Sequence, residues 1–363
     1  MSGTDGETEL ETIYSLGIDI GSTTVKLVLT DPEGRIVYSR YERHMSDVFY
    51  KVRELIGAMF TEMGDIVIRP VITGSGGLSL ANILKVRFEQ EVIACSKAVE
   101  TLIPETDCAI ELGGEDAKIT FYGATIEQRM NGTCAGGTGA FIDQMAILLN
   151  TDPMGLNEAA KNHKMIYPIA ARCGVFAKTD IQPLINDGAA VEDLAASIFQ
   201  AVVNQTISGL ACGHPIKGKV AFLGGPLSFL SELRKRFIET LNLTDDEVIF
   251  PEDSKFFVAI GAAMLSERSE AIRLAELTER LNTADPALLS DTKRIDVLFE
   301  DEEDYRVFKE RHDRDKARRN DIARASGKTY LGIDAGSTTT KAVLMDEDGA
   351  ILYSFYAGNE GIR

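Results

Sequence analysis

The chain has 363 residues, and its 38 basic and 56 acidic side chains give a formal net charge of −18. Such a charge opposes sequence-independent binding to nucleic acid or to an anionic membrane surface. The 44% of hydrophobic residues is sufficient for a core, and no apolar run approaches the ~20 residues of a membrane span. The first eleven residues are polar and acidic, unlike a signal peptide. We therefore expect a cytoplasmic protein that contacts neither nucleic acid nor membrane.

The first predicted element is a β-hairpin with a small polar turn, Leu16-Gly-Ile-Asp-Ile-Gly-Ser-Thr-Thr-Val-Lys26. Its apolar strand ends near Asp19, Gly21 lets an anion approach the backbone, and the hydroxyl groups that follow can bind phosphate oxygens. A nearly identical segment, Leu331-Gly-Ile-Asp-Ala-Gly-Ser-Thr-Thr-Thr-Lys341, occurs near the end of the chain. Because two such copies are improbable as simple polar turns, we predict a hairpin that binds nucleotide phosphates.

Between the two copies, apolar strands alternate with helices. Strands are predicted at 16–20, 25–30, 35–41, 66–73, 107–112, 118–122, 219–223 and 247–250, and helices at 47–62, 94–102, 140–149, 191–212 and 256–266. Several strands end in glycine-rich loops that lead into helices. This order is typical of α/β folds whose ligands bind at strand ends.

The repeat and the charge distribution divide the chain into four parts. We expect a polar tail at 1–12, a complete domain at 13–267, a charged and mostly helical connector at 268–328, and the first hairpin of a second, truncated repeat at 329–363. A single hairpin is not independently stable. We interpret the sequence as the amino-terminal part of a longer protein.

Two further glycine pairs, Gly113-Gly114 and Gly224-Gly225, follow predicted strands and could meet the first hairpin in one cleft. In order and content these loops resemble the superfamily of actin, hexokinase and the heat-shock chaperone ATPases. The resemblance implies an α/β, actin-like ATPase fold. Two ribonuclease-H-like halves would then hold ATP and Mg²⁺ in an interdomain nucleotide cleft.

The same resemblance assigns roles to individual residues. The first phosphate loop contains Asp19, which would reach Mg²⁺ through water, together with Gly21, Ser22, Thr23, Thr24 and Lys26. The second contains Glu111, Gly113, Gly114, Glu115, Asp116 and Lys118, and the adenosine loop contains Gly224, Gly225 and Pro226. Asp19, Glu111 and Asp116 are the expected catalytic carboxylates. Glu111 replaces the Asp of many relatives, so it either contacts the metal or orients water, and Lys26 either contacts ATP or is a solvated strand residue.

Two segments that contain cysteines resemble a smaller family within this superfamily. They are Asn131-Gly-Thr-Cys134-Ala-Gly-Gly-Thr-Gly139 and Ala171-Arg-Cys173-Gly-Val-Phe-Ala-Lys-Thr-Asp180. Together with the second phosphate loop, they resemble the activators of 2-hydroxyacyl-CoA dehydratases and the ATPase subunits of benzoyl-CoA reductases, over most of residues 14–265. Large relatives carry two ATPase modules.

This narrower resemblance implies that Cys134 and Cys173 bind a [4Fe-4S] cluster. Each cysteine precedes a small residue and a helical segment, where free N–H groups and the helix dipole favour a thiolate. Clusters usually take four thiolates, so two per chain imply a homodimer with the cluster on its two-fold axis. The residues Gly136, Gly137, Thr138 and Gly139 are expected to approach the ATP phosphates, to shape the helix after Cys134, or to do both, and the alternative is a simple loop at the start of that helix.

The remaining cysteines, Cys95, Cys108 and Cys212, are expected to be buried small side chains. A zinc site is disfavoured, because no Cys-x-x-Cys pair occurs and the four histidines lack ligand spacing.

Our leading hypothesis is therefore an ATP-dependent electron-transfer activator. It would take one electron from a low-potential ferredoxin or flavodoxin and reduce an acyl-CoA dehydratase or reductase, which could lie on the same polypeptide. Two alternatives remain open. A sugar-type small-molecule kinase of the same fold would need a carboxylate base beside a polar pocket, and a non-catalytic ATP sensor would show little turnover and no iron.

Overall fold

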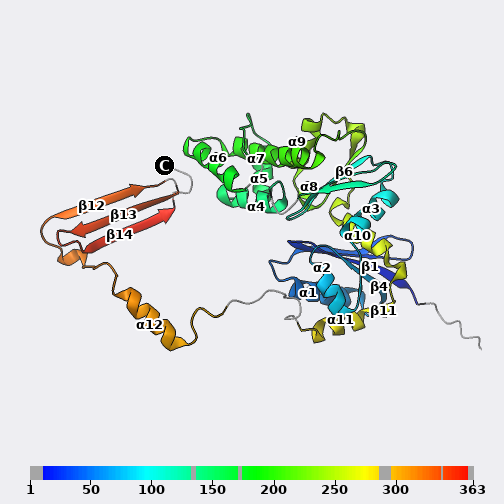
Figure 1. The fold of residues 1–363 in the computed structure, drawn as a ribbon, viewed down its shortest axis with the longest axis horizontal. Coiled ribbons are helices and arrows are strands. Elements are labelled where there is room, and N and C mark those ends of the chain that lie inside the picture. The colour runs from blue at the N-terminus through cyan, green and yellow to red at the C-terminus, as the bar shows by residue number, and fades with distance from the viewer. Residues whose placement is uncertain (1–10, 132–135, 171–173, 286–295, 337, 359–363) are drawn as a thin grey trace, which may run out of the picture. The chain divides into compact units, whose positions relative to one another are not determined.

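The computed structural model describes residues 11–131, 136–170, 174–285, 296–336 and 338–358. Two units are distinguished, and each is described by itself: residues 1–180 with 190–290, and residues 181–189 with 291–363. The first unit contains two sheets that are covered by helices, and we call these lobe I and lobe II (Figure 1).

Lobe I is built on a six-stranded sheet. Its strands β1 (Ile13–Ile20), β2 (Thr24–Thr30) and β3 (Ile36–Arg43) form an antiparallel meander, and β4 (Val67–Thr73) pairs in parallel with β1. The short strands β5 (Arg87–Phe88) and β11 (Ile272–Arg273) both pair with β4. The helices α1 (Val48–Met63), α2 (Gly77–Leu84) and α11 (Leu274–Thr283) bury their apolar side chains against one face of this sheet.

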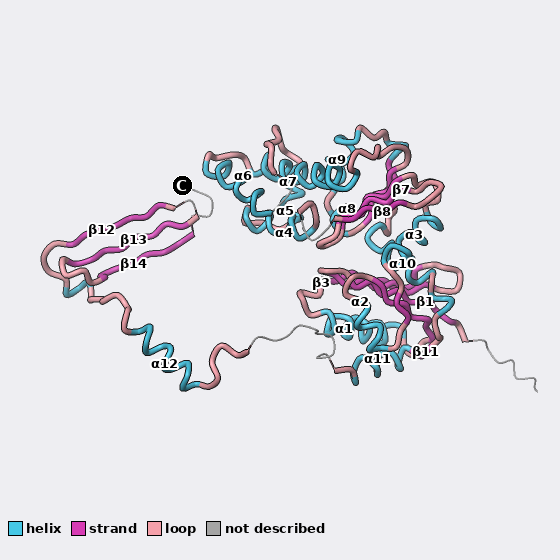
Figure 2. Tube along the Cα trace, viewed as in Figure 1, coloured by secondary structure: helices cyan, strands magenta, loops and turns pink. Residues whose placement is uncertain are grey.

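Lobe II repeats this pattern with five strands. The strands β6 (Cys108–Leu112), β7 (Ala117–Phe121) and β8 (Glu127–Met130) are antiparallel, and β9 (Val220–Leu223) and β10 (Val248–Ile249) continue the sheet in parallel beyond β6 (Figure 2). Its helices are α4 (Gly139–Leu148), α5 (Pro153–Ala160), α7 (Val191–Thr206), α8 (Gly225–Phe229) and α9 (Ser231–Leu241), and the first part of α6 (Gly174–Asn186), whose residues 181–186 are grouped with the second unit. The meander-plus-parallel order of both sheets fits two related halves.

Two helices, α3 (Glu91–Leu102) and α10 (Phe257–Met264), pack between the two sheets. Their shared core includes Val28 and Val71 from lobe I and Ala109 and Leu223 from lobe II. Contact between α10 and β1 is very close, because a Cβ atom on Gly17 would lie 1.9 Å from the carbonyl oxygen of Ala259. A side chain at this position would therefore push helix and strand apart.

We expect Gly17→Ala to lower the free energy of unfolding by about 1–3 kcal/mol, the usual cost of overpacking a core. The second copy offers a matched control, because a Cβ atom on Gly332 would meet nothing closer than the Val343 oxygen at 4.0 Å. Gly332→Ala should leave stability unchanged or slightly raised. Denaturant unfolding of both variants measures this, and equal effects would contradict the close packing of α10 on β1.

Most predicted elements are confirmed, with ends shifted by one to three residues. The predicted strand at 247–250 is shorter than expected, because a 3₁₀ turn, Asp245–Glu247, precedes β10. The charged connector also begins later than residue 268. Strand β11 joins the sheet of lobe I, and Leu274, Leu277 and Leu281 of α11 enter its core. The amphipathic spacing of these leucines is hidden by the surrounding charges.

The predicted buried helix at 191–212 consists of α7 and a π-helical turn, Ile207–Ala211. By length and composition, residues 191–211 could cross a membrane, but 67% of their most apolar window is buried inside the protein. Among the described residues, this is the one helix that meets such a criterion. Burial of this kind is ordinary for a core helix.

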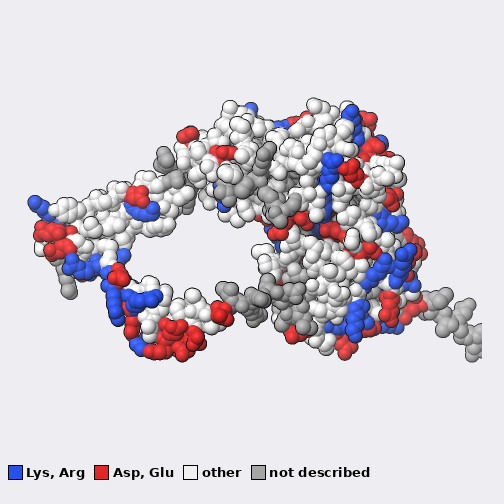
Figure 3. All heavy atoms as spheres, in the orientation of Figure 1, with Lys and Arg blue, Asp and Glu red and all other residues white. Residues whose placement is uncertain are grey.

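The second unit contains α12 (Glu302–Asp313) and a three-stranded antiparallel sheet of β12 (Thr329–Ala335), β13 (Thr339–Asp346) and β14 (Ile351–Gly358). The first copy and this copy share a strand register, with Asp19 opposite Lys26 and Asp334 opposite Lys341. Uncharged atoms cover much of this sheet, whereas acidic groups gather on α12 (Figure 3). In this three-stranded sheet, the apolar residues Leu331 and Ile333 of β12 are 63% and 67% exposed.

Candidate nucleotide site

Three strand-end loops of the first unit meet where the two lobes approach each other. The first follows β1, the second connects β6 with β7, and the third follows β9. The backbone N–H of Glu115 donates a hydrogen bond to Ser22 Oγ at 3.1 Å. A Cβ atom on Gly114 would lie 2.1 Å from Thr23 Oγ1, so only glycine allows this contact. The two predicted phosphate loops therefore touch each other.

A small cavity of about 30 Å³ lies among these loops. Its lining contains predicted residues from all three: Gly21, Ser22, Thr24, Lys26, Glu111, Gly113, Gly114, Asp116, Lys118, Gly224, Gly225 and Pro226. It also includes Tyr41, Glu91 and Leu112, which sequence analysis did not identify. Glu91 was missed because an acidic residue in the first turn of a helix is ordinarily a helix-dipole feature.

Asp19 is not among the residues that line this cavity, but it pairs with Lys26, which is, and it is 1% exposed. Its Oδ2 accepts a hydrogen bond from Lys26 Nζ at 2.6 Å, while Oδ1 is buried without a hydrogen-bond partner among the described residues. Burial raises the pKa of Asp19 more strongly than the Lys26 ammonium lowers it. A buried carboxylate oxygen without a donor can accept a hydrogen bond from water on Mg²⁺, so this residue fits the expected metal.

Lys118 is the centre of a second buried charge group. Its ammonium donates to Glu91 and lies 3.6 Å from Glu111 Oε1. Burial alone would lower the pKa of Lys118, but these two carboxylates outweigh that effect and raise it. Burial raises the pKa of Glu111, and the nearby Lys118 ammonium offsets only part of this rise. Lys118 therefore stays charged and holds two carboxylates at the wall of the cavity.

A larger cavity of about 470 Å³ adjoins these loops. It is lined by Thr23, Thr24, Tyr41, Arg43, Gly114, Gly139, Ile142, Asp143, Asp152, Pro153, Met154, Gly225, Pro226, Phe229 and Leu230. Apolar and aromatic walls of this size suit a small-molecule ligand with a flat ring. Gly139, Gly225 and Pro226 at the starts of α4 and α8 were predicted, whereas the apolar residues Ile142, Met154, Phe229 and Leu230, on or directly after α4, α5 and α8, carry no glycine motif and were missed.

The remaining predicted residues lie elsewhere. Glu115 is exposed, and Gly136, Gly137 and Thr138 line neither of these two cavities. Thr138 is the residue before the first turn of α4, which agrees with a role for this segment at the helix start. The predicted cluster ligands Cys134 and Cys173 lie outside the described residues. Within the described part, no group of three or more His, Cys, Asp or Glu side chains could hold a metal.

Cys95 and Cys108 are buried as predicted, but Cys212 is exposed. The prediction for Cys212 was wrong because the apolar helix ends one residue earlier. Cys212 takes a left-handed conformation at the end of the π-helical turn, and its Sγ donates to the oxygen of Gly209 at 3.3 Å.

Both ends of the segment that contains Cys134 are hydrogen-bonded to the second phosphate loop. At its start, the Asn131 amide nitrogen donates to the oxygen of Glu115 at 3.0 Å, and Oδ1 accepts from the N–H of Ala117 at 2.7 Å. At its end, the N–H groups of Gly139 and Ala140 donate to the oxygens of Gly113 and Gly114 at 3.0 and 2.7 Å. A displacement of the second phosphate loop would therefore pull on both ends of the Cys134 segment through these hydrogen bonds.

Two similar lobes with glycine loops that converge on buried carboxylate–lysine pairs define an ATPase of the actin-like fold. The particular family follows from the sequence profile that matches residues 16–266: the chain belongs to the BadF/BadG/BcrA/BcrD ATPase family.

Named relatives share most of their length with this chain. The 2-hydroxyisocaproyl-CoA dehydratase activator of Clostridioides difficile is 29% identical over 259 residues, which cover 69% of this chain and 94% of that protein. The (R)-2-hydroxyglutaryl-CoA dehydratase activating ATPase of Acidaminococcus fermentans is 30% identical over 220 residues, covering 59% and 83%.

Solved structures of dehydratase activators are similar to this chain. The crystal structure of component A of the Acidaminococcus fermentans (R)-2-hydroxyglutaryl-CoA dehydratase is similar with a TM-score of 0.62 and 25% identity, over 69% of this chain and 96% of that one. The activator of the 2-hydroxyisocaproyl-CoA dehydratase from Clostridium difficile, with bound ADPNP, has a TM-score of 0.58 and 25% identity over 78% and 100%.

Proposed function

We propose that this protein is an ATP-dependent activator that delivers one electron to an acyl-CoA dehydratase or reductase. The relatives named as dehydratase activators support the partner class. The observation that carries the proposal is the hydrogen bonding of both ends of the Cys134 segment to the second phosphate loop. Through these bonds, nucleotide binding can alter the surroundings of Cys134.

In this proposal ATP lies with its phosphates at the small cavity and its adenosine in the 470 Å³ cavity. Ser22, Thr24, Lys26 and the loop N–H groups would contact phosphate oxygens, and Asp19 would hold Mg²⁺ through water. Glu111 and Asp116 orient the water that attacks the terminal phosphate. Lys118 keeps Glu111 in place and balances part of its charge.

Cys134 and Cys173 would bind a [4Fe-4S] cluster that two chains share, and the cluster would supply one-electron transfer at low potential. Two helices begin close behind these cysteines, α4 at Gly139 and α6 at Gly174. A low-potential ferredoxin or flavodoxin would be the donor in the cytoplasm. The sheet of the second unit, which keeps the Asp–Lys register of the first copy, would begin a second ATPase module.

Anaerobic purification tests this function against its alternatives. The activator should contain iron, hydrolyse Mg²⁺-ATP and accept an electron from dithionite in one preparation. A kinase would instead transfer phosphate to a sugar and contain no iron. A sensor would bind ATP with neither turnover nor iron, and either of these results would contradict the proposal.

Asn131→Ala should separate nucleotide binding from its effect on the cluster. The substitution removes the two side-chain hydrogen bonds between Asn131 and the second phosphate loop, and the backbone bond from the Asn131 N–H to the oxygen of Ala117 remains. We expect ATP to remain bound, with at most about a fivefold loss in affinity, while the nucleotide-dependent change in the rate of iron chelation becomes smaller, because the backbone bonds at Gly139 and Ala140 remain.

Gln128→Ala is the matched control for Asn131. This amide lies nearby on β8, but it bonds to Thr120 of β7 and not to the phosphate loop. It should keep the nucleotide response. A full response in Asn131→Ala would show that these bonds do not transmit the state of the nucleotide.

A further inference from the structure

An ion pair connects the two lobes at the wall of the larger cavity. Arg43, the last residue of β3, donates from Nη1 and Nη2 to the two carboxylate oxygens of Asp143 at 2.8 and 3.0 Å. Asp143 lies on α4 of lobe II, and both residues line the 470 Å³ cavity. A guanidinium that binds a carboxylate through two parallel hydrogen bonds fixes the relative orientation of its partners better than a single contact does.

The geometry of β3 explains why Arg43 reaches lobe II. Side chains two residues apart lie on the same face of a strand, so Tyr41 and Arg43 point the same way. The ring of Tyr41 contacts Phe229 of α8 edge-on, with 5.3 Å between centroids. One end of β3 therefore contacts lobe II at two points, once through an apolar pair and once through an ion pair.

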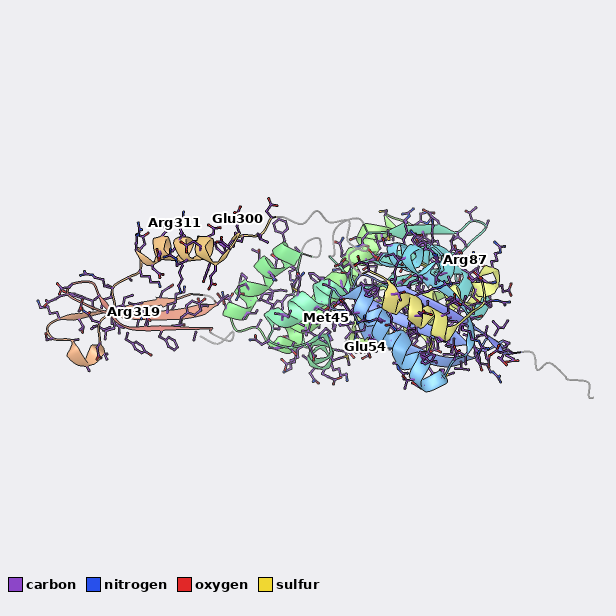
Figure 4. The ribbon with its side chains drawn as sticks, turned by 90° about the horizontal axis from the view of Figure 1, so that it is seen from below. Met45, Glu54, Arg87, Glu300, Arg311 and Arg319 are labelled. Carbon is purple, nitrogen blue, oxygen red and sulfur yellow. The ribbon has the colours of Figure 1, made fainter. Side chains whose placement is uncertain are left out.

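The residue after Arg43 binds the first phosphate loop. His44 is 6% exposed, and its Nδ1 accepts a hydrogen bond from the N–H of Ser46 at 3.1 Å. The proton of the neutral ring is therefore on Nε2, which donates to the oxygen of Gly21 at 3.1 Å. The chain then turns through Met45 and Ser46, both with positive φ, and Met45 is 82% exposed (Figure 4).

Adjacent residues thus contact different parts of the site. His44 holds the loop that would receive phosphate, and Arg43 holds the helix that follows the Cys134 segment. A shift of the first phosphate loop would move the end of β3 and change the Arg43–Asp143 distance.

The second copy lacks this connection. Tyr356 faces Lys341 as Tyr41 faces Lys26, so the strand register is retained. At the position of Arg43, which faces Thr24, the second copy has Gly358, which faces Thr339. The ion pair is therefore not a general requirement of the repeated sheet.

We propose that the Arg43–Asp143 ion pair is a latch that holds the two lobes together over the bound nucleotide and slows its release. Arg43 and Asp143 act as positioning residues in this role. The inference rests on the proposed function, because it requires a nucleotide in the cavity. The pair is partly exposed, with 54% and 26% of the two side chains accessible, so the effect should be moderate.

The experiment measures dissociation of a fluorescent ADP analogue by stopped flow in the presence of Mg²⁺. Arg43→Gln and Asp143→Asn should each raise the dissociation rate ~3–10-fold, the range for a well-oriented ion pair. Because both changes break one interaction, the double variant should be no faster than either single one. Exchange of the two residues, Arg43→Asp with Asp143→Arg, should recover most of the slow release.

Arg40→Gln is the matched control. Arg40 lies on the same strand and donates to Glu62 of α1 at 2.7 Å, an exposed ion pair within lobe I. Its removal should leave dissociation unchanged, and thermal unfolding should confirm that all variants are folded. Wild-type dissociation rates in Arg43→Gln and Asp143→Asn, or additive effects in the double variant, would overturn the proposed latch and leave the proposed function untouched. Failure of the wild type to bind the analogue would overturn the proposed function and the latch with it.

Discussion

Asp19→Asn should reduce the rate of ATP hydrolysis by about 10²–10³-fold, the usual scale for loss of a group that holds a catalytic metal or stabilises developing charge. The asparagine keeps the shape of Asp19 but removes the charge that pairs with Lys26 and would hold Mg²⁺ through water. The reduction should be in kcat more than in nucleotide affinity. Steady-state hydrolysis at saturating Mg²⁺-ATP measures it.

The chain contains its own control for this variant. Asp334 and Lys341 form the equivalent pair in the second copy, at 2.8 Å, but their side chains are 63% and 42% exposed. In this 363-residue chain, Asp334→Asn should leave hydrolysis within about twofold of the wild type, since exposed pairs contribute little. Wild-type activity in Asp19→Asn would contradict the role given to this carboxylate.

Cys134→Ser or Cys173→Ser should abolish iron binding, with a fall from about two irons per chain to nearly none. Each substitution removes two of the four thiolates that a shared cluster needs in a dimer. The measurement is iron and acid-labile sulfide per chain after anaerobic purification, together with the molecular mass in solution. The cluster-free variants should be monomers if the cluster alone joins the two chains.

The other three cysteines serve as controls because none of them lies in the two motifs that contain the proposed cluster ligands. Burial and the nearby Glu111 carboxylate raise the pKa of Cys95, and burial raises that of Cys108 to about 12, so both remain thiols. Cys212 is exposed but lies outside the matched motifs. Cys212→Ser should keep its full iron content, and unchanged iron in Cys134→Ser and Cys173→Ser would exclude the proposed ligands.

The strands and glycine turns of the predicted phosphate loops are confirmed, because each depends on local features. A glycine after an apolar strand and a carboxylate at a fixed spacing can be recognised without knowledge of the tertiary fold. The Asp19–Lys26 pair is such a case, since the two residues face each other across one hairpin.

Other parts of the site depend on contacts that are distant in the sequence. Glu91 reaches Lys118 from the first turn of α3, and Arg43 meets Asp143 across the lobes. Nothing in the local pattern of either residue distinguishes it from an ordinary surface charge. The late start of the connector was missed for a related reason, because the leucines of α11 become a core face only when that helix packs on lobe I.

In the proposed mechanism, the nucleotide at the phosphate loops controls the surroundings of the Cys134 segment. Its most direct test is the rate at which a chelator removes iron from the oxidised wild type, with Mg²⁺-ADP or with a non-hydrolysable ATP analogue bound. We predict rates that differ by at least about fivefold, the lower end of typical coupling between two sites. Equal rates with both nucleotides demonstrably bound would contradict this control of the Cys134 segment by the nucleotide.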